Sequence, residues 1–530
     1  MTNVTHQPCD KGVILGGKVE TTTHSVARQN WVLAATILGS SIAFINGSTM
    51  NVALPAIQAD LEASVTDIQW ILNSYTLFLA ALILLGGSLG DHFGRKRVFT
   101  IGVVVFTLAS VWCGLAPNAM QLIIARAVQG LGGALLTPGS LAIISATFTT
   151  QERGRAIGLW SGFSTLTSAI GPLLGGWLID TVGWRWIFYM LVPLAITVVA
   201  ITLRYVPESR DEEVKGGLDW WGAILATGGL GFITYALIES SNRGLGNVVV
   251  LGTIGLGIVL LVAFVLVEAR QPAPMVPLNL FQDSTFSGTN ILTFLLYMGL
   301  GAALFFLPLN LIQVQGYSAT QAGAAFLPMI LLMSFLSRWA GGLVDRVGAK
   351  LPLVVGPLLC GVGFFLFGLQ GVGGSYWLTF FPAIVILGLG LAITVAPLTT
   401  TVMNAVPAHF SGTASGINNA VARVANLLAI AALGLVVLGV FGQELEQRVA
   451  ALDLPPATQQ AILAERTKLA AIAVPDGLSP AAQSEVQEAI DESFVQSFRV
   501  VAWISAVLAV ISAAVAWVMV ERKVEKRVEL

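Results

Sequence analysis

Fourteen long apolar runs restrict what this chain can fold into more than any other feature of its sequence. A run of about 18 apolar residues or more, folded as an α-helix, is long enough to cross a hydrocarbon layer of roughly 30 Å. Charged residues make up only 11% of the chain, whereas a soluble globular domain carries about 25%. The sequence therefore predicts an all-α membrane protein with 14 transmembrane helices.

A repeated motif divides these runs into two related halves. GSLGDHFGRKRVF, at 87–99, returns as GGLVDRVGAKLPL, at 341–353, with a constant offset of 254 residues. Five positions match: Gly87, Leu89, Asp91, Gly94 and Lys96 correspond to Gly341, Leu343, Asp345, Gly348 and Lys350. We expect an N-terminal six-helix bundle at 30–206, a linker with two extra transmembrane helices at 207–285, and a C-terminal six-helix bundle at 286–520.

The distribution of Lys and Arg predicts the orientation in the membrane. Both residue types concentrate in the even-numbered loops and in the two tails, at 1–29 and 521–530. Since positive charge accumulates on the cytoplasmic side, both termini are expected to be cytoplasmic in a multi-pass protein of the cytoplasmic (inner) membrane. Segment 442–492 would then be an extracytoplasmic loop, containing short amphipathic helices and serving either as a spacer or as a gate.

Motifs of soluble enzymes are absent or misplaced. GGSLG, at 86–90, fits the pattern of a nucleophile elbow but lies inside an apolar run, and no phosphate-binding GxxxxGK[ST] motif occurs. The four histidines and three cysteines are scattered, so no metal site and no cofactor is expected. No basic run suggests nucleic acid as a partner. If the chain transports a solute, it must use an ion gradient.

Polar residues inside apolar helices are expensive and therefore mark candidate sites. In the fourth run, Arg126 and Gln129 share a helical face, which indicates either substrate or coupling electrostatics, or a structural arginine bound to backbone carbonyls. In the thirteenth run, Asn419 and Arg423 share another face with Asn426, as part of either a cavity wall or a hydrogen-bond network.

Two further spans carry unusual patterns. The first run contains four polar residues that either line a cavity or bond to neighbouring helices: Asn46, Ser48, Thr49 and Asn51. The fifth run contains SAIGPLLGG, in which Gly171, Pro172 and Gly175 allow close helix packing and bending. We expect a hinge at these residues, although packing and gating cannot be separated by spacing alone.

These motifs resemble those of the Major Facilitator Superfamily, specifically its fourteen-span drug:proton antiporter branch, over residues 30–520. The resemblance implies two bundles around a central cavity and export rather than import, because SAIGPLLGG is similar to the fifth-span motif of exporters. GSLGDHFGRKRVF resembles the family's signature loop. The implied cytoplasmic gate comprises Gly87, Asp91, Gly94, Arg95, Arg97, Asp345 and Lys350.

One residue departs from the pattern of this branch. NVALPAI, at 51–57, is similar to its first-span motif, but the family usually has an aspartate where this chain has Asn46. An amide cannot bind a proton or a cation by ionisation. With Arg126 and Arg423 lacking an obvious acidic partner, the cavity is expected to be neutral to positive and to favour neutral or anionic amphipathic compounds.

The function expected from this resemblance is export of small amphipathic compounds by proton antiport and alternating access, without enzymatic activity. The partners would be a small-molecule substrate, protons and the lipid bilayer, with the protein acting as a monomer. Two alternatives remain open: a dedicated exporter of one metabolite or antibiotic, and a membrane receptor that transports nothing.

Overall fold

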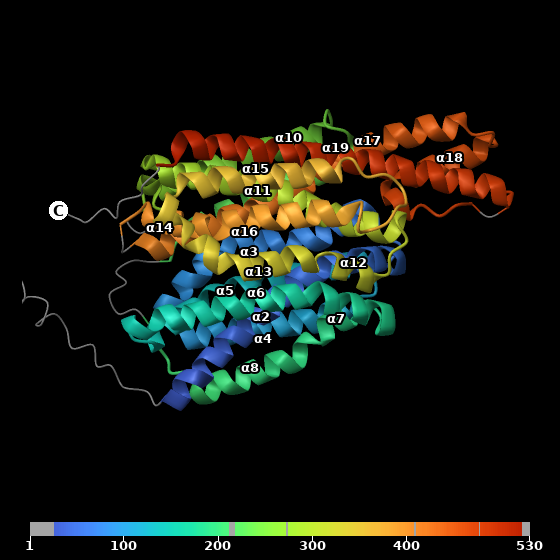
Figure 1. The fold of residues 1–530 in the computed structure, drawn as a ribbon. Coiled ribbons are helices and arrows are strands. Elements are labelled where there is room, and N and C mark those ends of the chain that lie inside the picture. Colours follow the sequence, from blue (N-terminus) through green and yellow to red (C-terminus); the bar gives the residue numbers. More distant parts are fainter. Residues whose placement is uncertain (1–25, 211–217, 272–273, 408–409, 476, 522–530) are drawn as a thin grey trace, which may run out of the picture.

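The computed structural model describes residues 26–210, 218–271, 274–407, 410–475 and 477–521. Fourteen helices in these ranges are long and apolar enough to cross a membrane, so the predicted all-α fold is confirmed. They lie roughly parallel in one elongated bundle (Figure 1). Nothing in the pattern of spans contradicts the expected division into six, two and six.

The N-terminal half contains six spans. Its helices are α2 (Val26–Asp60), α3 (Val65–Phe93), α4 (Arg95–Leu115), α5 (Ala119–Thr147), α6 (Thr150–Val182), α7 (Trp186–Tyr189) and α8 (Leu191–Tyr205), the last two forming one span. The two additional spans are α9 (Trp220–Arg243) and α10 (Val248–Glu268).

The remaining elements are the short linker helix η1 (Leu278–Gln282) and the helices of the C-terminal half. The latter are α11 (Ser284–Leu309), the π-helical turn η2 (Asn310–Val314), α12 (Ala319–Ala325), α13 (Leu327–Gly341), α14 (Leu343–Val347), α15 (Lys350–Phe367), α16 (Phe380–Asn404), α17 (Ser411–Ala451), α18 (Pro456–Ala464), η4 (Arg466–Ala471) and α19 (Pro480–Met519).

The two ends of the bundle differ and need names. We call the end where α2 begins and α19 ends the termini side, and the end where α18 lies the loop side; they are at the left and right of Figure 1. The repeated motif lies on the termini side in both halves. Gly94 and Gly348, which correspond in the repeat, have φ of 106° and 85°. Such a backbone strongly favours glycine, so the repeat preserves a turn as well as residue identities.

Segment 442–492 is more helical than its composition indicates. The membrane helices α17 and α19 extend through most of it, to 41 and 40 residues. At about 1.5 Å per residue each helix is roughly 60 Å long, about twice the hydrocarbon thickness. The two helices therefore project beyond the bundle on the loop side together with α18 (Figure 1), whereas η4 lies back at the bundle, in contact with α2, α3 and η2.

The two halves are pressed together on the loop side, where α6 crosses α12. A Cβ added to Gly176 would collide with the backbone carbonyl of Ala319, and one added to Gly323 with that of Pro172. Only glycine permits such an approach of two helix backbones. The structure thus has its two halves closed against each other at this end.

A carboxylate reinforces this closure. Asp180, near the end of α6, accepts hydrogen bonds from the backbone N–H groups of Ala319 and Thr320 at 3.1 and 2.8 Å, and one from the Thr320 hydroxyl. It therefore caps the N-terminus of a helix that belongs to the other half, where a negative charge is favourable.

We expect Asp180→Asn to weaken the loop-side closure, because the amide keeps the size of the side chain but loses its charge. A loss of about 1 kcal/mol would shift the ratio of closed to open loop sides by roughly fivefold. Spin-label distances between α6 and α12 in detergent measure this ratio. Asp60→Asn is the control, since Asp60 pairs with Arg185 at 2.6 Å inside one half. An unchanged distance distribution in Asp180→Asn would contradict the role of the cap.

Candidate functional site

A large cavity lies between the two halves. Its volume is about 1630 Å³, and its wall includes residues from the N-terminal half, from the C-terminal half and from the linker that precedes α11. Most ligand pockets measure roughly 300–1,000 Å³, so this one can hold a bulky solute. Residues at the ends of α3, α16 and η1 line its mouth on the termini side, among them Asp91, Met403 and Asn279. The cavity therefore opens on the side opposite the closed contact.

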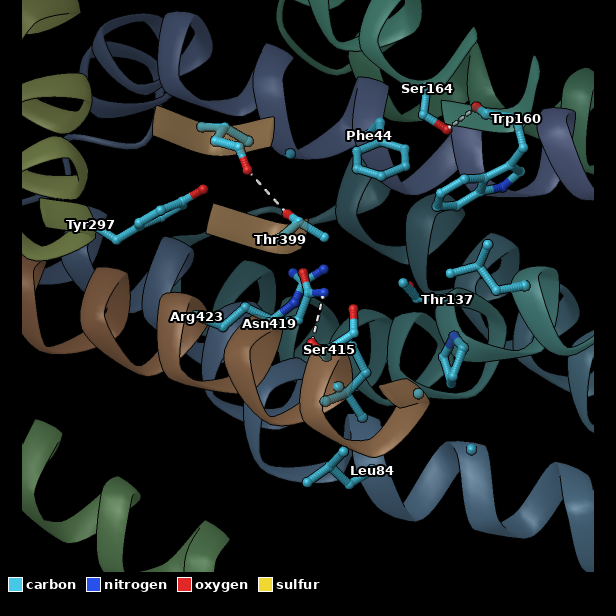
Figure 2. A pocket seen from close by; sticks show the side chains of 18 of the residues that line it. Phe44, Leu84, Thr137, Trp160, Ser164, Tyr297, Thr399, Ser415, Asn419 and Arg423 are labelled. Carbon is cyan, nitrogen blue, oxygen red and sulfur yellow. Dashed lines mark hydrogen bonds between the residues drawn. The ribbon is translucent and has the colours of Figure 1, made fainter. Parts of the chain in front are cut away.

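The cavity wall is mainly apolar and aromatic with a few polar groups. Phe44 and Trp160 contribute rings from the N-terminal half, and Tyr297 contributes one from α11, as Figure 2 shows. Thr399 and Asn419 add polar groups from the C-terminal half. Such a lining suits compounds with an apolar body and a small number of polar atoms.

The structure separates the sequence-predicted polar residues into two groups. Ser48, Asn51, Asn419 and Arg423 lie on the cavity wall. Asn46, Thr49, Arg126 and Gln129 are each at most 3% exposed and do not form part of the wall. The second group is positioned to hold helices together, and its part in substrate binding or coupling stays a prediction.

Arg126 is the centre of a polar network inside the N-terminal half. Its Nε donates to the carbonyl oxygen of Ile71 at 3.1 Å, and its Nη1 donates to Gln129 Oε1. The guanidinium carbon lies 4.2 Å from the centre of the Tyr75 ring. The sequence left two alternatives for Arg126, a functional charge and a structural arginine bound to backbone carbonyls. These contacts are those of the structural arginine.

Gln129 and Thr49 extend this network between helices. The Gln129 amide donates to Ser110 Oγ at 2.7 Å and to Asn46 Oδ1 at 3.4 Å, so position 46 contacts the network rather than the cavity. Thr49 donates to the carbonyl oxygen of Gly171 at 2.9 Å. These bonds connect α2 to α5, α4 and α6.

Arg423 lies in a different environment. It projects from α17 toward the cavity beside Asn419 (Figure 2). Its buried Nε has no hydrogen-bond partner, and no described acid forms an ion pair with its guanidinium. Asn419 donates to the Ser415 carbonyl within its own helix at 3.1 Å. Arg423 is therefore a cation on the cavity wall that has no acidic partner among the described residues, and its part in substrate binding stays a prediction.

The predicted hinge residues pack tightly against α2. A Cβ on Gly171 would collide with the Ser48 side chain, and one on Gly175 with Thr49. Pro172 is buried and contributes to the cavity wall. The contacts show why glycine is required here for packing, and bending at this point stays a prediction.

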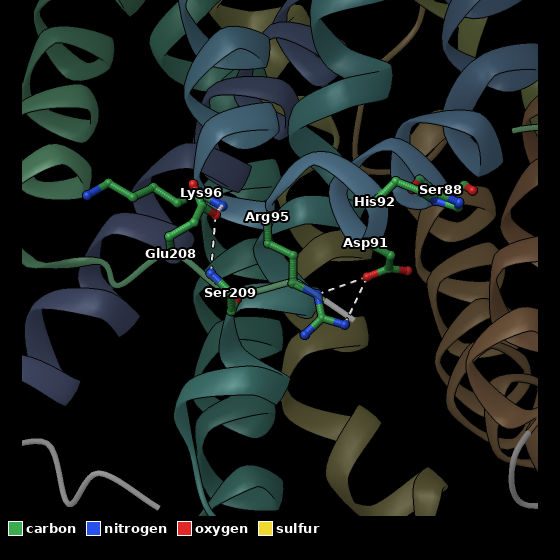
Figure 3. Close-up of polar contacts among 7 residues, drawn as sticks. All are labelled: Ser88, Asp91, His92, Arg95, Lys96, Glu208 and Ser209. Carbon is green, nitrogen blue, oxygen red and sulfur yellow. Dashed lines mark hydrogen bonds and ion pairs between the residues drawn. The ribbon is translucent and has the colours of Figure 1, made fainter. Parts of the chain in front are cut away.

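The signature loop joins α3 to α4 on the termini side (Figure 3). Arg95 pairs with Asp91 at 2.8 Å, while the exposed Arg97 contributes its backbone N–H to another contact. Asp91 and Gly87 also line the cavity. In the second copy of the motif, Lys350 lies 5.4 Å from the Trp517 ring on α19, and the Asp345 side chain falls outside the described part of the chain.

Sequence reasoning missed Glu208, which anchors this loop. Its carboxylate accepts the backbone N–H groups of Lys96 and Arg97 at 3.0 and 3.2 Å, at the N-terminus of α4. A Cβ on Gly94 would lie 2.7 Å from this carboxyl group. The sequence identifies the stretch PESRDEE only as a charged linker. Nothing in its spacing indicates that Glu208 binds the backbone of a helix more than 100 residues earlier in the chain.

Sequence comparison shows the family to which the chain belongs. The profile of the Major Facilitator Superfamily matches residues 36–430. The chain belongs to the Major Facilitator Superfamily. It is therefore a multi-pass membrane protein of a transporter family and not an enzyme.

Named relatives of this superfamily cover most of the chain. Multidrug resistance protein Stp of Mycobacterium tuberculosis is 35% identical over 82% of this chain and 80% of its own length. The tetracenomycin C resistance and export protein of Streptomyces glaucescens is 30% identical over 94% and 93%.

Solved structures of the superfamily share the fold. A bacterial homologue of the human lysosomal transporter Spinster, in an inward-facing conformation, aligns with a TM-score of 0.61 and 18% identity over 93% of this chain and 98% of its own. The D-xylose–proton symporter aligns with a TM-score of 0.57 and 15% identity over 93% and 98%. At these identities the likeness concerns the fold alone.

We expect the two arginines to respond differently to truncation. Arg126→Ala removes two hydrogen bonds and leaves the Gln129 oxygen without its donor, which should lower the free energy of unfolding by about 2 kcal/mol. Arg423→Ala removes a side chain whose Nε has no hydrogen-bond partner and should change stability little. Thermal unfolding of the purified proteins in one detergent measures both. Equal destabilisation would contradict the assignment of Arg126 to the network and Arg423 to the cavity.

Proposed function

We propose that this protein exports small amphipathic compounds across the cytoplasmic membrane by proton antiport and alternating access. The observation that supports this most directly is the cavity between the halves, open on the termini side and closed on the loop side. With both termini in the cytoplasm, such an arrangement is the inward-facing state, in which a solute enters from the cytoplasm or the inner leaflet.

The names of the relatives support export of toxic compounds. Stp is named for multidrug resistance, and the tetracenomycin C protein for resistance and export. The second name also supports a narrower candidate, a dedicated exporter of a single antibiotic. The large and mainly apolar wall favours the broader one, since apolar contacts are not directional and select only weakly between compounds.

The charge of the cavity indicates the substrate class. Arg423 is the only lysine or arginine among the described residues that line it, whereas the lining carboxylates, Asp91 and Asp219, lie at the termini-side mouth. An unpaired guanidinium binds carboxylate, sulfonate or phosphate groups strongly. The cavity therefore suits neutral and anionic amphipathic compounds better than lipophilic cations.

We expect purified protein in proteoliposomes to move a substrate uphill only when a pH gradient is imposed, because proton movement drives the solute. The measurement is flux of fluorescent neutral, anionic and cationic compounds, with protein-free vesicles as the control. Uphill transport that persists after the gradient is abolished would rule out proton antiport. Transport of only one of many compounds tested would favour the dedicated exporter.

We expect Arg423→Gln to weaken transport of anionic compounds while neutral ones are affected little. Losing a charge-assisted hydrogen bond of about 1.5 kcal/mol should raise the apparent KM for an anion roughly tenfold. Arg423→Lys keeps the charge and should recover part of the loss, and Thr399→Val serves as a control on the same wall. Equal effects on anions and neutral compounds would contradict a role in charge selection.

A further inference from the structure

A second polar site lies outside the central network, where the two additional helices meet on the termini side. Asp219 immediately precedes α9, and Glu268 is the last residue of α10. Their exposed fractions are only 4% and 2%. Acidic residues are rarely buried so deeply without a cation, so this pair calls for a physical explanation.

The two carboxyl groups face each other across Gly222. A Cβ added to Gly222 would collide with Asp219 Oδ2 and would lie 2.7 Å from Glu268 Oε1. Both oxygens therefore lie within 2.7 Å of one point beside Gly222.

One oxygen of each carboxyl group is satisfied and the other is not. Asp219 Oδ1 accepts the N–H of Gly222 at 2.8 Å and the amide of Gln271 at 3.3 Å, and Glu268 Oε2 accepts the N–H of Val276 at 3.0 Å. The remaining oxygens, Asp219 Oδ2 and Glu268 Oε1, are buried without any hydrogen-bond partner. These are the two atoms that flank Gly222.

Among the residues that the structure describes, no cationic side chain pairs with these carboxyl groups, although Asp219 lies at the N-terminus of α9. Arg270 follows Glu268 closely in sequence, but its side chain is exposed. The other ionisable groups on neighbouring elements are Asp91 and His92 on α3, Arg423 on α17 and Asp283, which caps α11.

Two ionised carboxylates cannot be held together in such a place at reasonable cost, because each is desolvated and repels the other. A single proton removes both problems. Bound to one oxygen, it neutralises one charge and converts two unsatisfied acceptors into one O–H···O hydrogen bond. The unpaired oxygens are thus the geometric signature of a shared proton.

We propose that Asp219 and Glu268 form a proton-binding site that holds the linker segment 274–283, which precedes α11, against the mouth of the cavity. Glu268 binds this linker through Val276, and the neighbouring residues Met275 and Asn279 line the cavity together with Asp219. Loss of the proton leaves two negative charges in contact and drives the linker away from the mouth. The site goes beyond the proposed transport function and can be tested without measuring transport.

The proton itself can be observed by infrared difference spectroscopy. Purified protein, titrated from mildly acidic to mildly alkaline pH, should lose the carbonyl band of one buried protonated carboxyl group. Asp219→Asn and Glu268→Gln should each lack this band, while Glu239→Gln should keep it, because Glu239 pairs with Arg243 elsewhere on α9. A wild-type spectrum without the band, or variants that retain it, would overturn the site.

The effect on the linker can be observed by spin-label distances. Labels at Phe93→Cys and Asn279→Cys span the mouth, in a background in which Cys9 is replaced by Ser and the buried Cys113 and Cys360 stay unlabelled. We expect the distance to shift with pH in this background and in Glu239→Gln. Glu268→Gln should remain at the low-pH distance, because its amide can donate to Asp219 as the proton does.

These experiments test the proton-binding site independently of the proposed transport function. A pH-independent distance in the parent, or an unchanged pH response in Glu268→Gln, would overturn the proton-controlled linker even if transport is proton-driven. A shift caused by sodium at constant pH instead of by protons would overturn it as well. Failure of proton-driven transport would leave the band and the distance shift as they were measured. Thermal unfolding of every variant excludes misfolding as the cause.

Discussion

Every polar side chain inside this bundle must find its partner within the protein or in a cavity, because lipid offers none. This requirement separates the two arginines. Arg126 donates to Ile71 and Gln129 and lies over Tyr75, so its charge is used to hold α3 and α5 together. Arg423 lacks such partners and faces the cavity. The two arginines thus differ in their hydrogen-bond partners, although they are the same residue type and both lie inside the bundle.

The two ends of the bundle are built from different interactions. On the loop side, backbone contacts through Gly176 and Gly323 close the structure, and such contacts are lost over a small displacement. The Asp180 carboxylate adds a charged contact across this closure. On the termini side, the polar contacts instead lie within single halves or in the linkers: the Asp91–Arg95 pair, the Glu208 cap and the buried pair of Asp219 and Glu268. The closed end is thus the one at which close packing and a carboxylate cap both join the two halves.

The sequence predicted the parts of this fold that depend on local spacing. Apolar runs gave the spans, and a fixed offset gave the repeat, to which the structure adds that the matching glycines, Gly94 and Gly348, occupy similar turns. The orientation of the polar residues in the first span was harder to predict. At about 100° per residue, Ser48 and Asn51 lie on one face and Asn46 and Thr49 on the opposite one. Spacing alone therefore gave two pairs, but which pair faces the cavity depends on how α2 packs between α5, α6 and α11.

Contacts between distant segments could not be predicted. Glu208 caps a helix that begins at Arg95, Asp180 caps one that begins at Ala319, and Glu268 meets Asp219. Each carboxylate occurs near the end of a span, where acids are common and usually solvated. What makes them specific is a partner far away in sequence, and no periodic pattern records that.

The projecting helices show how such a distant contact changes the interpretation of a segment. The sequence did not decide whether segment 442–492 is a spacer or a gate. In the structure, Gln58 on α2 donates to the carbonyl oxygen of Lys468 in η4 at 3.0 Å and accepts from Gln313 at the same distance. Segment η4, at the base of the projection, therefore packs against the N-terminal half beside a contact between the two halves, because Gln313 belongs to η2. Because α17 and α19 are continuous with membrane helices of the C-terminal half, any rocking of that half moves η4 as well, and the contact with Gln58 must break whenever the loop side opens.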